Sequence, residues 1–341
     1  MSDFAQLSEA SQAERLQMLA ATALGDWGFA DADLDLIKIR ENAVYRATRP
    51  SGERFVVRVH RAHYHTDQAL RSEFQWMEAL TGAGIKTPTV IPAKDGDLFK
   101  VAEIDGVPEP RQVDVLAWVD GEPLGTIEGG IDVDEQSLVA TFEYIGAAAA
   151  KMHNQIEAWT LPAGFERGAF DLDGLTGEKP HWGRFWDCEL LDDAGRETML
   201  RGRDKLRADL EAFGTAPDRF GLIHADLLPE NFLVAENETN LIDFDDSAFG
   251  WHLFDLSTPL FFHLGEDHFD AIVEAMIRGY RAHRDLRDGH VAKLLTFLVA
   301  RGTTYLGWIH TRPESDTVKE IGQTVADGVV ELTHSYLQDA S

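Results

Sequence analysis

The sequence is poor in cysteine and in long apolar runs. It has one cysteine, Cys188, which excludes an internal disulfide framework and a zinc site built on cysteines. No apolar run approaches the roughly 20 residues that a transmembrane helix needs. The segment Met1–Ala20 is polar and amphipathic, unlike a secretory signal. We therefore expect a cytoplasmic protein that has no membrane partner.

Basic residues are also few. The chain has 31 Lys and Arg residues against 59 Asp and Glu residues, which gives a formal net charge of −28. A surface of this sign repels phosphate backbones and anionic lipid headgroups, which argues against nucleic-acid binding and polybasic membrane docking. The acidic residues are spread along the chain, so solubility is their favoured role, and a preference for cationic or metal-bound ligands is the alternative. The oligomeric state is not predicted.

Neither repeats nor low-complexity stretches interrupt the chain, so all 341 residues are expected to fold. Strand patterns dominate up to about residue 118 and helical patterns dominate afterwards. We predict an α+β, bilobal fold: a β-rich N-lobe (1–118) with an antiparallel sheet and one inserted helix, and an α-rich C-lobe (119–341) with an insertion at about 158–213. The expected strands are 36–39, 44–47, 54–59, 89–91, 98–103 and 113–118, and the expected helices are 8–24, 68–80, 142–157, 200–213, 267–283, 289–310 and 315–337.

The most informative segment is Gly221–Asp255. A short apolar run leads into His224-Ala-Asp226, and Asn231 follows Asp226 by five residues. Two apolar runs around a polar turn predict a hairpin between Asn231 and Asp243. Because a hairpin returns the chain on itself, we expect Asp226, Asn231 and Asp243 to converge. Amide and carboxylate oxygens suit Mg²⁺, and a second carboxylate remains to accept a hydroxyl proton, which is the arrangement that phosphoryl transfer uses.

The string HADLLPEN (224–231) is similar to the catalytic loop H-x-D-x-x-x-x-N of protein kinases and the aminoglycoside phosphotransferase family. The string DFD (243–245) resembles the metal-binding turn that follows that loop. Over about residues 36–310, the chain resembles the group of aminoglycoside phosphotransferases, choline kinases and type II homoserine kinases. A chance cluster of turn-forming residues and a dinuclear metallohydrolase are the disfavoured alternatives.

This resemblance implies a protein-kinase-like fold whose N-lobe covers ATP, with ATP and Mg²⁺ as cofactors. It implies that Asp226 is the catalytic base and that Asn231 and Asp243 bind Mg²⁺. It also implies that His224 braces the catalytic loop through hydrogen bonds.

The N-terminal part matches the family less closely. Residues 37–47 resemble the first hairpin, which lies over the ATP phosphates, but its turn, 40–42, ends in Asn42 and contains no glycine. The expected strand 113–118 resembles the hinge strand that offers backbone groups to adenine, which makes Ala117 a candidate contact.

Arg58 marks the clearest departure from the family. It lies where the third strand of related kinases carries a lysine that pairs with the α/β-phosphates and with a helix glutamate. Arginine keeps the charge and can bind two oxygens at once, but it is longer and planar. We expect Arg58 to contact the nucleotide phosphates and to be oriented by Glu73, with Glu78 as the second candidate partner.

Three functions fit this pattern. The favoured one is a small-molecule kinase that moves the γ-phosphoryl group of Mg-ATP to a hydroxyl of an amino alcohol, an aminoglycoside or a similar acceptor. Leu228 and Ala225 replace the lysine and arginine of eukaryotic-type protein kinases, and eleven residues between Asp243 and Asp255 leave no room for a regulated activation loop. A bacterial stress-response protein kinase is the alternative, and a pseudokinase, suggested by Arg58, is the third.

Several other groups have a favoured structural interpretation and a functional alternative. We expect loop histidines rather than a metal site at 60, 63 and 65, and a buried, unreactive Cys188. Asp255 is expected to cap the next helix and to brace the catalytic loop. The aromatic residues Trp182, Phe185 and Trp186 are equally compatible with a core or an acceptor pocket, whereas core packing is favoured for Arg301, Tyr305 and Trp308, which share one helix face.

Overall fold

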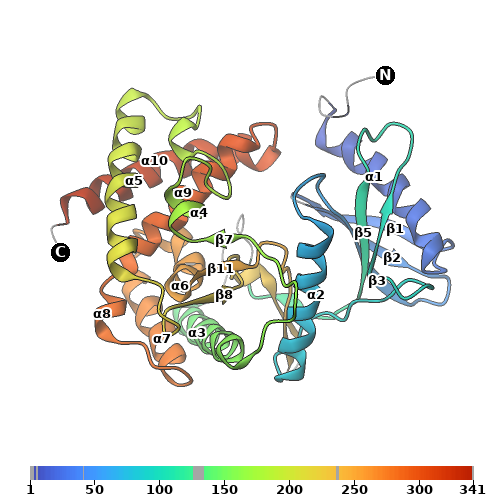
Figure 1. Cartoon of the computed structure of the whole chain (residues 1–341), viewed down its shortest axis with the longest axis horizontal. Helices are drawn as coiled ribbons and strands as arrows, with labels where there is room; N and C mark the ends of the chain where they lie inside the picture. Colours follow the sequence, from blue (N-terminus) through green and yellow to red (C-terminus); the bar gives the residue numbers. More distant parts are fainter. Residues whose placement is uncertain (1–3, 5–6, 41, 126–133, 236–237, 340–341) are drawn as a thin grey trace. The chain divides into compact units, whose positions relative to one another are not determined.

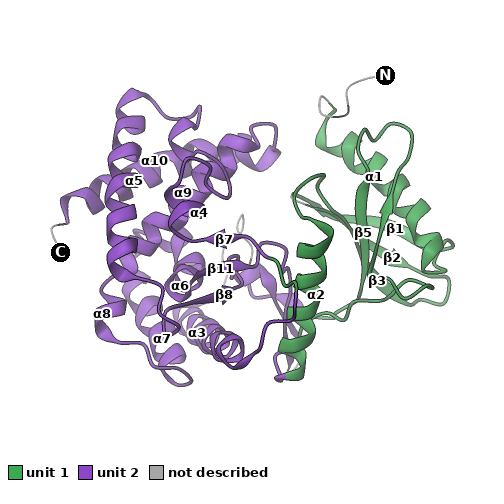
Figure 2. Cartoon of the chain, in the orientation of Figure 1, with its two compact units in different colours: residues 1–82, 86–121, 164–166 green, residues 83–85, 122–163, 167–341 purple. Residues whose placement is uncertain are grey.

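The computed structural model describes residues 4, 7–40, 42–125, 134–235 and 238–339. The chain forms two compact units, the first from residues 1–82, 86–121 and 164–166 and the second from the remaining residues (Figure 2). The first unit is built on a β-sheet and the second is mostly helical (Figure 1), which confirms the predicted α+β class with a β-rich and an α-rich part. Glu41, in the predicted phosphate-side turn, and residues 236–237, in the turn of the catalytic hairpin, lie outside the described residues.

A five-stranded antiparallel sheet, in the order β1-β2-β3-β5-β4, forms the first unit. Every second residue of β2 is buried, the period of a strand that turns one face to a core. Tyr45, at the centre of this face, is fully buried and donates its hydroxyl to the Ala13 carbonyl oxygen of helix α1 at 2.6 Å. The strands are β1 (Asp33–Ile39), β2 (Ala43–Thr48), β3 (Arg54–Val59), β4 (Phe99–Ala102) and β5 (Arg111–Ala117), and the helices are α1 (Glu9–Ala23) and α2 (Asp67–Gly82).

Helix α2 buries one apolar stripe, which includes Leu70, Phe74 and Met77, and places a charged residue within it. Glu73 lies one turn from Leu70 and Met77 on this stripe and is fully buried. Burial of an unpaired carboxylate costs free energy. We therefore expect Glu73 to pair with a positively charged residue of the sheet.

Helices account for most of the second unit, which also contains two short three-stranded sheets. The sheets have the orders β10-β9-β6 and β7-β11-β8. The strands are β6 (Glu122–Pro123), β7 (Ala169–Phe170), β8 (Phe220–Ile223), β9 (Phe232–Ala235), β10 (Glu238–Leu241) and β11 (Ala248–Trp251). The helices are α3 (Glu135–Ala158), α4 (Leu172–Thr176), α5 (Asp193–Phe213), α6 (His252–Leu260), α7 (Phe269–Arg281), α8 (Asp288–Val291), α9 (Leu294–Thr311) and α10 (Asp316–Gln338).

Two glycines allow helices α3 and α7 to pack closely. A Cβ atom on Gly146 of α3 would lie 2.1 Å from the Met276 carbonyl oxygen, and one on Gly279 of α7 would lie 1.9 Å from the Glu143 carbonyl oxygen. Any other residue would force the two helices apart at these points.

Several predictions of secondary structure were wrong in detail. Helix α3 begins at Glu135, seven residues before the expected helix 142–157, because Asp134 caps it by accepting a hydrogen bond from the Ser137 amide. Residues 89–91 form no strand but a single bridge, Val90 to Leu116. The expected helix 289–310 is two helices, α8 and α9, because the chain turns at Ala292 and Lys293. Helix α5 begins at Asp193, well before the expected residue 200, because Asp192 caps it by accepting a hydrogen bond from the Gly195 amide at 2.7 Å.

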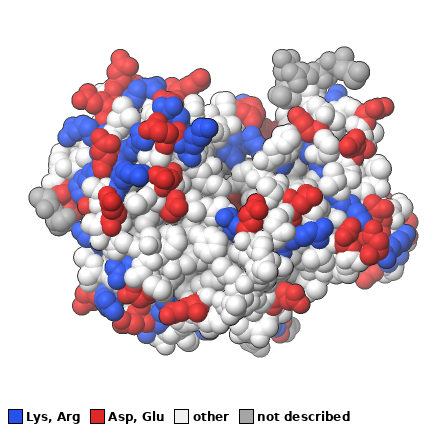
Figure 3. Space-filling view, in the orientation of Figure 1, with Lys and Arg blue, Asp and Glu red and all other residues white. Residues whose placement is uncertain are grey.

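The surface agrees with the charge pattern of the sequence. In Figure 3, acidic side chains are spread over the visible face, with basic groups among them.

Among the described residues, no helix is both long enough and apolar enough to cross a bilayer.

Candidate active site

The segment predicted to carry the chemistry lies wholly in the second unit. Strand β8 ends at Ile223, and the loop that follows contains His224 and Asp226. A short 3₁₀ turn ends at Asn231, and the antiparallel pair β9–β10 then returns the chain, as predicted. The Ile242 amide donates to the Asn231 carbonyl oxygen at 2.9 Å. This bond brings Asp243, the next residue, beside Asn231.

Asn231 and Asp226 are in direct contact. The Asn231 Nδ2 group donates to the Asp226 carbonyl oxygen at 2.8 Å and to Asp226 Oδ2 at 3.1 Å. Asn231 is buried, whereas the Asp226 side chain keeps 19% of its surface exposed. Because the amide nitrogen of Asn231 is directed at Asp226, its amide oxygen is the atom that can bind a cation.

Two residues of this segment have a strained backbone. Ala225 has φ 65° and Asp243 has φ 63°, values in the left-handed region that non-glycine residues seldom occupy. The carboxylate of Asp255 stabilises the first of these turns, because it accepts hydrogen bonds from the His224 amide at 3.0 Å and the Ala225 amide at 2.7 Å.

Asp255 thus braces the catalytic loop, but the expectation that it caps a helix was wrong. It lies in the first turn of α6, whose N-cap is Trp251 without a side-chain hydrogen bond. From one turn inside the helix, the Asp255 carboxylate can accept hydrogen bonds from the loop amides. A capping carboxylate would instead accept them from the first amides of its own helix.

His224 joins the loop to the strand that precedes Asp243. The Asp226 amide donates to His224 Nδ1 at 3.3 Å, which requires that nitrogen to be unprotonated. The other ring nitrogen, Nε2, then donates to the Ile242 carbonyl oxygen at 3.0 Å. The predicted bracing through hydrogen bonds is therefore present in the structure.

Arg301 holds the other oxygen of Asp226, although the sequence favoured core packing for this arginine. It is fully buried on α9 and donates to Asp226 Oδ1 at 2.9 Å and to the Ala225 carbonyl oxygen at 2.8 Å. The rings of Tyr305, Trp182 and Phe254 surround its guanidinium, with centroids 4.3, 5.1 and 5.5 Å away. These rings supply cation–π attraction and prevent the arginine from adopting another orientation.

Arg167 is a second arginine that sequence reasoning missed. It is buried and donates to the carbonyl oxygens of Phe244, at 3.2 Å, of Asp245, and of Ser247, at 2.6 Å. These bonds fix the turn that directly follows Asp243. A local sequence pattern cannot predict this role, because Arg167 is 80 residues away from Ser247 in the sequence.

In the first unit, Arg58 pairs with Glu73, as predicted, and also with Asp114. Arg58 Nη1 lies 2.8 Å from Glu73 Oε1, and its Nε and Nη2 atoms bind the two oxygens of Asp114 at 3.0 and 2.8 Å. Asp114 is opposite Arg58 in the β3–β5 register. The second candidate partner, Glu78, is exposed.

Asp114 is the centre of this buried cluster. His60 Nε2 lies 2.6 Å from Asp114 Oδ2. Burial acts to raise the pKa of Asp114, but the charge of Arg58 and the contact with His60 hold it below its usual value. One guanidinium therefore faces two buried carboxylates.

The remaining candidates are placed as follows. Asn42 is buried, and its Oδ1 accepts a hydrogen bond from the Arg61 amide at 3.4 Å. Ala117 ends β5, and its amide donates to the Thr89 carbonyl oxygen at 2.8 Å. Among the described residues, the histidines at 60, 63 and 65 form no cluster of metal ligands.

Comparisons with known proteins agree with this description. The model of the phosphotransferase enzyme family matches residues 37–290. A solved microcompartment-associated aminopropanol kinase is 31% identical, covers 94% of this chain and 97% of its own, and superimposes with a TM-score of 0.82. The amicoumacin kinase of Bacillus subtilis is 22% identical over 89% of this chain and 88% of its own.

A further solved structure is an amicoumacin kinase in complex with AMP-PNP and Ca²⁺. It is 19% identical, covers 96% of this chain and 94% of its own, and has a TM-score of 0.70, so it supports the fold. Taken together with the match to the family model over most of the chain, these similarities show that the protein belongs to the phosphotransferase enzyme family and is an ATP-dependent kinase of small molecules.

Proposed function

We propose that this enzyme transfers the γ-phosphoryl group of Mg-ATP to the hydroxyl of a small amino alcohol, with Asp226 as the catalytic base. The observation that carries the proposal is the pair of hydrogen bonds that holds Asp226 from both sides. Arg301 occupies one lone pair on Oδ1 and Asn231 occupies one on Oδ2. A carboxylate has about four acceptor positions, so an oriented Asp226 can still accept a substrate hydroxyl.

The residues beside Asp226 fit a Mg²⁺ ion. Asn231 offers its amide oxygen and Asp243 a carboxylate, and Mg²⁺ is commonly bound by one or two such ligands together with substrate phosphates and water. The ion, when bound, would neutralise charge on the phosphates of ATP. The strained backbone of Asp243 supports this assignment, because strain of this kind persists mainly at functional sites.

In the reaction, the acceptor hydroxyl gives its proton to Asp226. Its oxygen forms a bond to the γ-phosphorus, and the bond from that phosphorus to the bridging oxygen of ADP breaks. Asp226 aligns this attack, and Arg301 and Asn231 keep the carboxylate from turning away.

The acceptor is proposed to carry an ammonium group. Glu230 and Asp246 lie close enough to act electrostatically on Tyr305 and Arg301, respectively. Arg301 balances the charge of Asp226, so Glu230 and Asp246 leave an excess of negative charge near the base, which favours a cationic acceptor. The similarity to an aminopropanol kinase over nearly the whole of both chains supports an amino alcohol in particular.

A comparison of acceptors tests this proposal. ATP consumption would be measured with amino alcohols, with aminoglycosides, with neutral alcohols of matched size and with a generic protein substrate, each with wild type and Asp226→Asn. We expect turnover with an amino alcohol and little with its neutral analogue. Turnover with the protein substrate alone would support the stress-response kinase instead.

Arg301→Lys is expected to lower kcat by up to about 100-fold, since small misplacements of a catalytic group can have effects of this size. Lysine keeps the charge but cannot bind the Ala225 carbonyl and Asp226 with one planar group. Because Arg301 acts through Asp226, the KM for ATP should stay near its wild-type value. Steady-state kinetics would check this, with Arg278→Lys, in an exposed pair with Glu143, as the unaffected control.

Arg58 is proposed to contact the nucleotide phosphates. Arg58→Ala should raise the KM for ATP by about 10–100-fold, the value of one charge-assisted hydrogen bond, and Arg58→Lys should retain much of the activity. Arg58→Ala also leaves two buried carboxylates, so kinetics would be measured below the unfolding temperature of each variant. An unchanged KM in a folded Arg58→Ala enzyme would place the phosphate cation elsewhere, and activity that appears only in Arg58→Lys would indicate a pseudokinase.

A further inference from the structure

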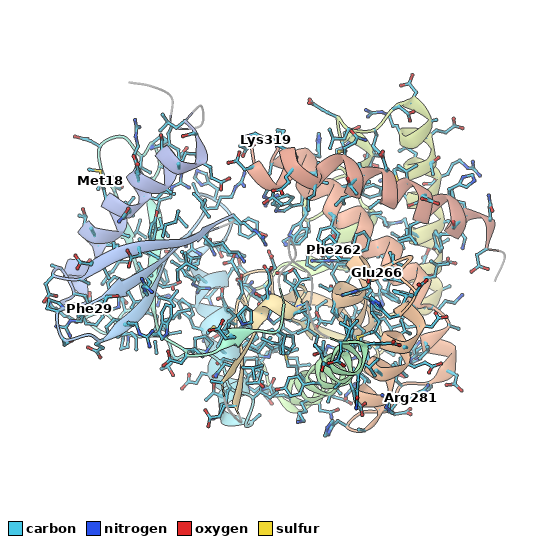
Figure 4. All side chains as sticks on the ribbon, turned by 180° about the vertical axis from the view of Figure 1, so that it is seen from behind. Met18, Phe29, Phe262, Glu266, Arg281 and Lys319 are labelled. Carbon is cyan, nitrogen blue, oxygen red and sulfur yellow. The ribbon has the colours of Figure 1, made fainter. Side chains whose placement is uncertain are left out.

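The connection between α6 and α7 carries three potential metal ligands outside the site described above. His263 ends a 3₁₀ turn after α6, and His268 directly precedes Phe269, the first residue of α7. Glu266 lies between them; Phe262 and Glu266 are labelled on this connection in Figure 4. Within the described part of the chain, these three residues form the one group of histidine and acidic side chains whose ligand atoms gather within 4.8 Å of one another.

The three ligand atoms converge closely. Glu266 Oε2 lies 2.8 Å from His263 Nδ1 and 2.6 Å from His268 Nε2, and the two nitrogens are 3.2 Å apart. Ligands of a tetrahedral zinc ion, with bonds of about 2.0–2.2 Å, are separated by roughly 3.3 Å. To bind an ion, the ligand atoms would therefore have to move apart by about 0.1–0.7 Å from their present separations.

Hydrogen bonds can also hold these three side chains together. Without an ion, each ring nitrogen can donate to Glu266 Oε2, which leaves the two donor nitrogens 3.2 Å apart. With a bound cation, both nitrogens and the carboxylate oxygen would instead present lone pairs to one centre.

The surroundings favour a fixed but accessible site. The ring of Phe142 packs edge-on against His263, with centroids 5.2 Å apart, and limits its rotation. Side-chain exposure is 13% for His263, 28% for His268 and 46% for Glu266, so an ion can enter and a water can complete its coordination. Two imidazoles and one carboxylate suit zinc and similar divalent transition metals, whereas Mg²⁺ prefers oxygen ligands alone.

We propose that His263, Glu266 and His268 bind one divalent transition-metal ion of the zinc class, separately from the Mg²⁺ of the catalytic site. The proposal does not depend on the identity of the acceptor or on turnover. The ion would link the end of α6 to the start of α7 and stabilise this connection.

Metal binding to the full chain tests the proposal. The protein would be dialysed against Co²⁺ with Mg²⁺ in large excess, which occupies oxygen-only sites, and bound cobalt would be counted per chain together with its visible absorption. We expect one Co²⁺ per chain in wild type and in the control His334→Gln, an exposed histidine of α10. His263→Gln, His268→Gln and Glu266→Gln should each weaken binding by at least about tenfold.

Two results would overturn the proposal. One is a wild-type protein that retains no cobalt under these conditions. The other is equal cobalt binding by wild type and by whichever of the three variants remain folded, which would place the ion elsewhere. A rise of the thermal unfolding midpoint with Zn²⁺ in wild type, absent in Glu266→Gln, would support the proposal independently.

Discussion

Asp226→Asn is expected to reduce turnover by about 10²–10⁴-fold, the usual contribution of a positioned general base. Asparagine keeps the size of the side chain, and its oxygen can still accept a hydrogen bond from Arg301. Its amide nitrogen cannot accept from Asn231, but the bond from Asn231 to the backbone carbonyl oxygen of residue 226 remains and should keep the loop in place. Asparagine cannot take the proton of the acceptor hydroxyl. The affinity for Mg-ATP, measured by calorimetry, should therefore be nearly unchanged while kcat falls.

A matched comparison separates loss of the base from loss of structure. Urea unfolding should show that Asp226→Asn is folded under the assay conditions, although with a lower free energy of unfolding, because the buried Arg301 loses its charged partner. If the folded variant turned over its acceptor at the wild-type rate, Asp226 would not be the base.

Asp243→Ala is expected to remove most of the Mg²⁺ dependence of nucleotide binding. Removal of a residue that only hydrogen-bonds to a metal ligand lowers metal affinity by about 10–100-fold. Removal of a charged ligand itself should therefore lower it by about 100-fold or more. Asn231→Ala should have a smaller effect, because a neutral amide oxygen is lost instead of a full charge. ATP titrations with and without Mg²⁺ would measure both.

Asp270→Ala provides the control for this series. It removes the same charge from an exposed position in the first turn of α7 and should leave the Mg²⁺ dependence of ATP binding at its wild-type value. An Asp243→Ala enzyme with the same Mg²⁺ dependence as wild type would exclude Asp243 as a ligand.

The sequence predicted those parts of the fold and site that depend on local pattern. Asp226, Asn231 and Asp243 flank a predicted hairpin, and this spacing predicts that they lie close together. Strands that are neighbours in the sequence commonly pair with each other, so few other arrangements had to be considered. The contact between Asn231 and Asp226 and the bond from Ile242 to Asn231 bear out that reasoning.

The residues that hold this site in place could not be predicted in the same way. Arg301 contacts Asp226, which lies 75 residues away in the sequence. Without knowledge of this partner, an arginine on an apolar helix face is interpreted as a packing residue. Asp114 reaches Arg58 across 56 residues through the β3–β5 register, which local patterns do not determine. The tertiary fold, and not the local sequence, selects these partners.

We propose, above all, that this chain moves a phosphoryl group from ATP to an amino alcohol through Asp226. The most direct measurement is ³¹P NMR of wild type and Asp226→Asn incubated with Mg-ATP and the amino alcohol that gave the highest turnover. We expect a new phosphomonoester signal, equal in amount to the ADP formed, with wild type, and its near absence with Asp226→Asn. Free phosphate in place of the ester would show that ATP is only hydrolysed, and equal ester formation by both proteins would show that Asp226 is not the base.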